Sequence, residues 1–438
     1  MPALTRKGFD GWGLYLALIV CLIPVVVPSG PARLAFVDGV IVLGLAAFGV
    51  LFLTRREPVR IPFMAPVLMI SVGSLAAVVN AESPSASFLT MAQDAYLFLW
   101  FIMLVHLLRD RDLTPIQLTW IWVGNIIAFW GIFLVLTQGH LSLLDIIKPK
   151  GKRAYGTFYD PNMFAGYLVM SLFFVLSMGR RLNWLVRWGS IVLMSVCIIA
   201  TKSNGGMLSM IIGLAVWAMM RAWTRRVPAV AMAATALLVL SLGVVALWLN
   251  AGIGVGAAQL REFSDNSFLA RGGHSAAGRF TIWNNLQETY ARSPLGIGPG
   301  NSRWLTLSIE DRLRPGSLQA KEAHNDYLAY AIERGPLGLI GLLALMGSAF
   351  GKLFAAARRR EDSDTTPDVD GPMVAALTGA LVASAVHALT IEVLHFRHFW
   401  MLMAIVCAIE SRIAGHRAQA MGAPTSGSMW SGRPEVAA

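Results

Sequence analysis

Long apolar runs separated by short polar segments recur along most of the chain. A helix that crosses a membrane needs about 20 mostly apolar residues. On this criterion the sequence predicts spans at Trp12–Pro28, Leu34–Leu53, Phe63–Val79, Phe88–Leu108, Ile116–Thr137, Pro161–Gly179, Trp184–Ala200, Asn204–Met220, Val227–Leu249, Leu337–Phe354, Met373–Ile391 and His398–Arg412. The pattern therefore predicts an all-α integral membrane protein with about twelve transmembrane helices.

One connection in this pattern is much longer than the others. Between the ninth and tenth spans, residues 250–336 are mostly polar. Loops of this length usually carry function, so we expect this one to hold part of a functional site, with short helices at the membrane interface. The expected organisation is then residues 1–249 with spans one to nine, the loop 250–336, residues 337–413 with spans ten to twelve, and a disordered cytoplasmic tail at 414–438.

Composition supports the membrane interpretation. Hydrophobic residues make up 56% of the chain and charged residues only 14%, whereas soluble domains are about half apolar and a quarter charged. The net charge of +11 would suggest nucleic acid in a soluble protein. Here we expect the partners of the basic residues to be membrane lipids with anionic head groups, and no nucleic acid. The three cysteines lie inside apolar runs and predict neither a disulfide framework nor a zinc site.

The distribution of lysine and arginine predicts how the spans are oriented. If the N-terminus is cytoplasmic, the inner segments carry 18 basic residues and the short outer loops carry 7. Basic residues concentrate on the cytoplasmic side of membrane proteins, so this orientation is favoured. It places both termini in the cytoplasm and the long loop 250–336 outside it. Long loops are translocated largely regardless of their charge, so the basic residues of this loop do not contradict the orientation.

The end of the long loop holds the strongest local signal. His324, Tyr327 and Leu328 fall on one face of a predicted short amphipathic helix at the membrane surface, which Gly335 and Pro336 should end. A histidine at the outer interface can act as a base near neutral pH. The alternative is that His324 is a polar interfacial residue with no chemistry.

These residues resemble the signature of the O-antigen ligase and polymerase superfamily. The signature is His-Asn-x-Tyr-Leu followed by Glu-x-Gly-x-x-Gly, found here as His324, Asn325, Tyr327, Leu328, Glu333, Gly335 and Gly338. Upstream, the stretches Gly278–Trp283, Pro294–Gly300 and Gly156–Asn162 resemble further patterns of the same superfamily.

The resemblance implies a GT-C-like, metal-independent glycosyltransferase of the bacterial inner membrane that needs no cofactor. Its donor would be a glycan carried on undecaprenyl diphosphate, and its acceptor a glycan or the lipid A core. His324 would take the proton of the acceptor hydroxyl, with Asn325, Tyr327 and Glu333 in support. Arg279 matches an arginine of the family's loop and is the first candidate to stabilise the charge of the leaving diphosphate. The loop contains no Asp-x-Asp pair, so its sequence gives no indication of a magnesium site.

The sequence departs from the family at one position. Related proteins often carry a Ser-Arg pair at the outer start of a span, where this chain has Ser203 and Asn204. Lys202 can supply the missing charge, although without the bidentate geometry of arginine. Arg153, the last residue of a basic run that begins at Lys148, is the other substitute. That run can instead bind anionic lipid head groups.

Two further groups of polar residues lie near the outer ends of spans. Asp94 lies inside the fourth span, and an acidic residue in a span is a candidate functional group. It can either orient an acceptor sugar or pair with an arginine. Glu392, His395 and His398 have a spacing that could suggest a metal site, but Arg397 beside them disfavours a divalent cation.

Two alternatives to this assignment stay open. A transporter also commonly has twelve spans and cytoplasmic termini, but transporters are built from two similar halves with sites near the midplane. Here the long loop follows the ninth span and the halves do not look alike. Within the superfamily, a polymerase joins lipid-linked repeat units and a ligase transfers the glycan to the lipid A core. The missing arginine of the Ser-Arg pair favours the polymerase.

The predicted orientation can be tested in the long loop. We expect a cysteine introduced as Ser317→Cys to react with a membrane-impermeant thiol reagent added to intact spheroplasts, because residues 250–336 are predicted to lie outside the cytoplasm. The parent chain, whose three cysteines lie in apolar runs, is the control. Reaction only after lysis would reverse the orientation.

Overall fold

The computed structural model of the 438-residue chain describes residues 10–26, 35–55, 59–109, 111–137, 153–158, 160–224, 290–302, 323–361 and 371–420. In these residues every regular element is a helix, which confirms the all-α class. Each segment that the sequence predicts as a span coincides with a helix, except Val227–Leu249, which lies outside the described residues together with most of the loop 250–336.

The helices follow one another in the order of the predicted spans. They are α1 (Gly11–Leu22), α2 (Phe36–Arg55), α3 (Met64–Ala77), the 3₁₀ turn η1 (Val78–Asn80), α4 (Pro84–Leu108), α5 (Thr114–Leu136), α6 (Pro161–Met178), the 3₁₀ turn η2 (Gly179–Arg181), α7 (Trp184–Ala200), α8 (Asn204–Thr224), α14 (Asp326–Glu361), α15 (Gly371–His387) and α16 (Arg397–Ala420).

Length and surface composition indicate a multi-pass membrane protein. Six helices (α2, α4, α5, α6 with η2, α8 and α14) are long and apolar enough to cross a bilayer. Large apolar side chains also remain exposed on the outside of the bundle, such as Leu43 at 72% and Leu136 at 76%. Contiguous apolar surface of this kind is unfavourable in water and favourable against lipid tails.

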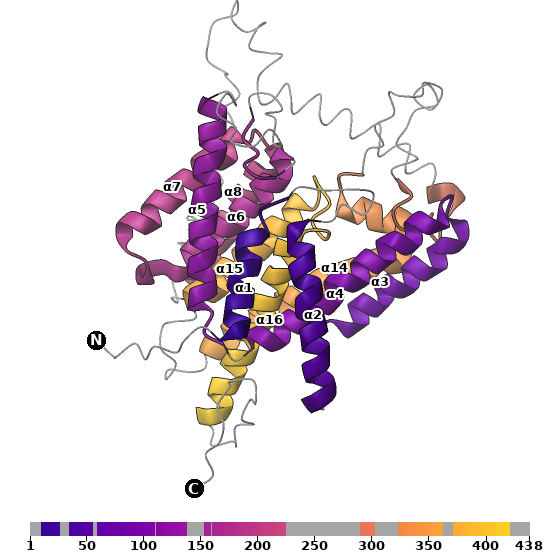
Figure 1. Cartoon of the computed structure of the whole chain (residues 1–438), viewed down its shortest axis with the longest axis horizontal. Helices are drawn as coiled ribbons and strands as arrows, with labels where there is room; N and C mark the ends of the chain where they lie inside the picture. Colours follow the sequence, from indigo (N-terminus) through magenta and orange to yellow (C-terminus); the bar gives the residue numbers. More distant parts are fainter. Residues whose placement is uncertain are drawn as a thin grey trace, which may run out of the picture.

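The helices form one bundle (Figure 1). Helices α5 to α8 lie on one side, α3, α4 and α14 lie on the other, and α1, α2, α15 and α16 lie between them. The C-terminal end of α16 is at the bottom of Figure 1. We call the opposite end of the bundle the upper end; it contains the first residues of α4, α6, α8 and α14 and the last residues of α15.

Small residues allow two helix pairs in this bundle to approach closely. A side chain at Gly213 of α8 would come within 2.8 Å of the Gly379 carbonyl oxygen of α15. In the same way, a side chain at Gly73 of α3 would come within 2.7 Å of the Arg334 carbonyl oxygen of α14. Small residues at such contacts bring backbones together, which is a common means of packing helices in membranes.

Helix α14 contains the break that the sequence predicts. Gly335 has φ 68° and ψ −170°, so the helix bends there, directly before Pro336. The left-handed φ favours glycine, and a side chain at this position would lie 2.5 Å from the Leu295 carbonyl oxygen. The segment before the bend differs from the predicted surface helix, because Ala329, Tyr330 and Ile332 are almost completely buried in the protein.

Two boundaries also differ from the sequence interpretation. The predicted helical face that included His324 is wrong, because α14 begins at Asp326 and His324 lies in the preceding turn with φ 51°. At the other end of the chain, residues 414–420 were expected in a disordered tail but continue α16 as helix. Their sequence is rich in alanine and in other residues of high helix propensity, which explains the extension.

Candidate functional site

His324 lies at the upper end of the bundle in a strained turn. Its φ of 51° is in the left-handed region, which residues other than glycine rarely adopt. Ala323 before it is fully buried, and Asn325 after it is 8% exposed. The His324 side chain is partly exposed. This is an accessible imidazole on a backbone fixed on both sides.

Asn325 and Tyr327 hold the start of α14. The Asn325 side-chain oxygen accepts a hydrogen bond from the Leu328 N–H at 3.1 Å, and its carbonyl accepts from the Ala329 N–H at 2.9 Å. Asn325 is therefore the N-cap of α14, a position at which asparagine is strongly preferred. The Tyr327 hydroxyl donates to the Ala385 carbonyl of α15 at 3.0 Å. Both residues position the helix that follows His324.

Glu333 binds the glycine-rich segment of residues 294–302. Its carboxylate accepts hydrogen bonds from the Gly300 N–H at 2.9 Å, the Ser302 N–H at 3.2 Å and the Ser302 hydroxyl at 2.6 Å. The carbonyls of Ile332 and Glu333 accept from the N–H groups of Ile297 and Gly298, both at 3.0 Å. The two family patterns found separately in the sequence thus form one structural unit.

Asn301 connects this glycine-rich segment to the start of α4. Its side-chain oxygen accepts from the Ser83 N–H at 2.9 Å, and its amide nitrogen donates to the Ser87 hydroxyl at 2.8 Å. Asn301 is 2% exposed. The sequence reasoning missed this residue, although an asparagine directly after a Gly-Pro-Gly turn is a common turn-stabilising signal.

Asp94 forms an ion pair with Arg334. The Arg334 Nη1 lies 2.7 Å from the Asp94 carboxylate and donates to the Ser74 hydroxyl at 2.7 Å. The guanidinium also lies over the ring of Tyr330, 4.5 Å from its centroid. Arg334 is 2% exposed, so this ion pair joins α14 to α3 and α4 inside the protein. The sequence reasoning counted Arg334 only as a basic loop residue.

Arg153 and Lys202 lie at neighbouring turns of the upper end. The Arg153 Nε donates to the Thr201 carbonyl at 2.8 Å, and an Nη donates to the side chain of Asn162 at 3.4 Å. Lys202, directly after Thr201, has φ 53°. The Asp160 and Ser203 side chains cap the first amides of α6 and α8. The turn therefore combines two cationic residues with the positive ends of two helix dipoles.

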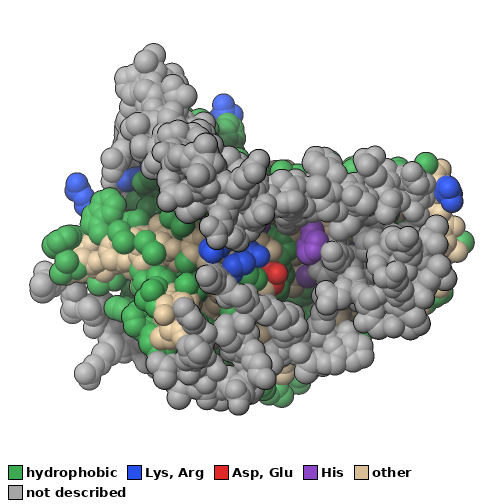
Figure 2. All heavy atoms as spheres, turned by 90° about the horizontal axis from the view of Figure 1, so that it is seen from above, with side chains coloured by type: hydrophobic (Ala, Val, Ile, Leu, Met, Phe, Trp, Pro, Cys, Tyr) green, Lys and Arg blue, Asp and Glu red, His purple; other side chains and the backbone are tan. Residues whose placement is uncertain are grey.

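The upper end carries charged groups of both signs and histidine. Figure 2 shows basic, acidic and histidine side chains close together on the face seen from above. Of the site residues predicted from the sequence, the structure describes His324, Asn325, Tyr327, Glu333, Asp94, Lys202 and Arg153. Arg279 lies outside the described residues.

The possible metal ligands near the start of α16 do not form a cluster. His398 is 4% exposed and stacks on Phe396, with ring centroids 5.2 Å apart. The His395 Nδ1 instead lies 3.5 Å from the Glu392 carboxylate. In the part of the chain that the structure describes, no group of three histidine, cysteine or acidic side chains is arranged to hold a metal ion.

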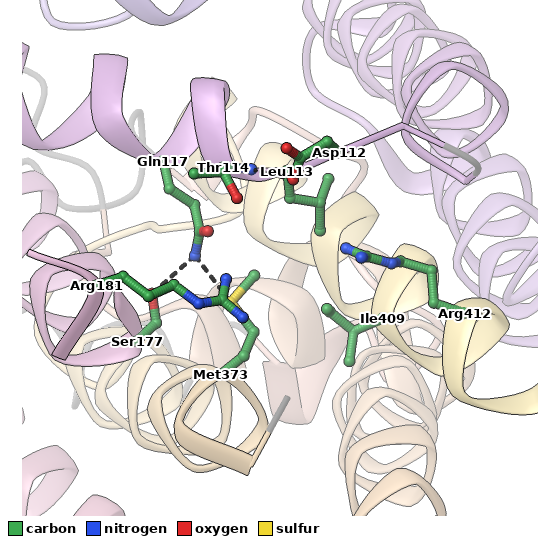
Figure 3. Close-up of a pocket in the computed structure, with 9 residues that line it drawn as sticks. All are labelled: Asp112, Leu113, Thr114, Gln117, Ser177, Arg181, Met373, Ile409 and Arg412. Carbon is green, nitrogen blue, oxygen red and sulfur yellow. Dashed lines mark hydrogen bonds between the residues drawn. The ribbon is translucent and has the colours of Figure 1, made fainter. Parts of the chain in front are cut away.

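The lower end of the bundle has a small polar pocket (Figure 3). The Gln117 amide nitrogen on its wall donates to the Ser177 hydroxyl and contacts the Met373 sulfur, both at 2.8 Å. Arg181 and Arg412 line it from opposite sides. None of the site residues predicted from the sequence lines this pocket.

Comparison with known protein families gives one match. The fold is that of an all-helical, multi-pass membrane protein. Residues 189–343 match the Wzy_C family, described as O-Antigen ligase, so this region of the chain is similar to that family. The matched region contains Lys202, His324 and Glu333, whereas Asp94 and Arg153 precede it. No curated protein matches the chain.

The Asp94–Arg334 pair generates a stability prediction. Asp94→Ala should lower the free energy of unfolding by about 3 kcal/mol, because it leaves the buried Arg334 without its carboxylate. Glu410→Gln is the matched control: it breaks the Lys352–Glu410 pair of 3.3 Å at the lower end, whose lysine side chain is 30% exposed where that of Arg334 is 2%, and should cost under about 1 kcal/mol. Unfolding in mixed detergent micelles, followed by circular dichroism, measures both. Equal losses would contradict the buried-pair assignment.

Proposed function

We propose that this protein is a glycosyltransferase of the bacterial inner membrane that transfers a glycan from undecaprenyl diphosphate to a sugar hydroxyl in cell-surface polysaccharide assembly. The observation that carries the proposal is that the O-Antigen ligase match includes His324, an accessible histidine on a fixed turn at the upper end. In the proposed orientation the protein has twelve spans, both termini are cytoplasmic, and the upper end faces the periplasm.

His324 is the proposed base of the reaction. The acceptor hydroxyl oxygen attacks the anomeric carbon of the donor, and its proton passes to the imidazole of His324. The bond between the anomeric carbon and the diphosphate oxygen breaks as the new glycosidic bond forms. Undecaprenyl diphosphate leaves with the bonding electrons. The reaction is balanced without a metal or cofactor.

The leaving diphosphate needs cationic partners, because its negative charge grows in the transition state. Arg153 and Lys202 are suited to this role by their place beside the capped first turns of α6 and α8. Arg279 remains the first candidate from the family resemblance. Arg334 is unsuited, since its guanidinium is buried and paired with Asp94.

A polymerase is favoured over a ligase, because Asn204 stands where related proteins often have the arginine of the Ser-Arg pair. Purified protein in lipid nanodiscs should convert lipid-linked repeat units alone into a ladder of longer lipid-linked chains. A ligase would give product only after addition of lipid A core. Gel analysis of the two mixtures distinguishes the activities, and no transfer in either mixture would refute the proposed function. The transporter alternative predicts that last outcome.

The role of His324 can be tested by substitution. His324→Ala should lower the transfer rate by about 10²–10⁴-fold, the usual contribution of a positioned proton acceptor, while lipid-linked donor accumulates in the membrane. His324→Gln keeps a hydrogen-bonding side chain but cannot take the proton, so it should be equally inactive. Polysaccharide output measured in a deletion strain reports both. Wild-type output from the Gln variant would mean that His324 is only a structural residue.

A further inference from the structure

A second buried carboxylate lies two residues after His324 and has no part in the chemistry above. Asp326 is 0% exposed. Its carboxylate accepts hydrogen bonds from the Val393 N–H at 2.6 Å and the Leu394 N–H at 3.3 Å. Its own N–H donates to the Ala388 carbonyl at 2.8 Å. Three hydrogen bonds thus join this one residue to the connection between α15 and α16, residues 388–396.

This connection is itself firmly held. The N–H groups of Thr390 and Ile391 donate to the His387 carbonyl at 2.8 and 3.1 Å, and the Trp400 indole donates to the Leu394 carbonyl at 2.8 Å. Ala388, Val393 and Leu394 are at most 3% exposed. Asp326 is therefore bonded to buried residues of a connection that has its own hydrogen bonds.

The turn before Asp326 needs such an anchor. A left-handed φ at a non-glycine residue such as His324 costs free energy and persists where the surrounding structure determines the backbone on both sides. The Asn325 cap fixes the first turn of α14, but it cannot fix that turn relative to the rest of the protein. Asp326 and Tyr327 provide this, by bonding to residues 385–394.

We propose that Asp326 is the positioning residue of His324: its carboxylate, bound to the amides of Val393 and Leu394, sets where the imidazole stands relative to the bound substrates. The inference rests on the proposed function of His324. Asp326 itself does not touch substrate, because its side chain is fully buried. Displacement of a reacting group by about 1 Å can cost about 10²-fold in rate.

The test compares substitutions of Asp326 in purified full-length protein in nanodiscs, with kcat and KM measured for the lipid-linked repeat unit. Asp326→Ala should lower kcat by about 10²-fold with KM within about twofold, because the donor-binding residues are elsewhere. Asp326→Asn keeps an oxygen that accepts from Val393 and should stay within about tenfold of the wild-type kcat. Glu410→Gln, which weakens the packing of α14 on α16 at the lower end, should leave kcat unchanged.

A double-mutant cycle separates positioning from general destabilisation. If Asp326 acts through His324, Asp326→Ala should cause no further loss in the His324→Gln background. An additive loss, or a wild-type kcat for Asp326→Ala, would overturn the inference. If the Ala variant is not recovered in membranes, Asp326→Glu replaces it; the added methylene displaces the turn and should lower kcat at least about tenfold, and an unchanged kcat would again overturn the inference.

The same assay distinguishes failure of this inference from failure of the proposed function. An inactive His324→Gln together with a fully active Asp326→Ala removes only the positioning role of Asp326. A fully active His324→Gln removes the proposed role of His324 as the base, and the positioning role of Asp326 with it. Absence of transfer by the wild-type protein removes the proposed function itself.

Discussion

Backbone N–H groups in an irregular segment buried at the end of a helix bundle must find acceptors outside regular helices, because leaving them unpaired is costly. In this protein the acceptors include the carboxylates of Asp326 and Glu333, seven residues apart on the first turns of α14. The Asp326 carboxylate accepts hydrogen bonds from N–H groups of the α15–α16 connection, and the Glu333 carboxylate accepts from N–H groups of the glycine-rich segment 294–302. These two carboxylates thus tie the start of α14 to two irregular segments.

The charged residues at the start of α14 are buried and bind other parts of the protein, whereas the preceding His324 is partly exposed. Arg334, Asp326 and Glu333 are all at most 8% exposed, and each has partners within the protein. His324, by contrast, is partly exposed, and its backbone is constrained by these buried neighbours. Buried side chains of this kind can fix the position of the imidazole without contacting the substrate themselves.

The sequence predicted the class, the helices and the bend in α14 well, because apolar runs and a Gly-Pro pair act locally. Residues 326–336 were harder. The periodicity of Tyr327 and Leu328 suggested a surface helix that included His324, whereas the N-cap of Asn325 and the buried contacts of Arg334 are set by tertiary partners. Asp326, Asn301 and Arg334 were missed for the same reason: their partners lie at Val393, Ser87 and Asp94, distant in sequence.

The proposed base and the proposed ligand Lys202 lie in turns before different helices, α14 and α8, so their relative position depends on how α8 packs on α15. Gly205, three residues after Lys202, lies directly against Thr390, and Thr390 belongs to the connection that Asp326 binds. A short path of contacts therefore runs from the Lys202 turn through Thr390 to Asp326 and His324. Because Gly213 and Gly379 bring the two helix backbones together farther along, any larger residue at these glycines would separate α8 from α15. Such a change would move the cationic turn away from the imidazole without altering either group, so the small residues of this contact belong to the site as much as the charged ones do.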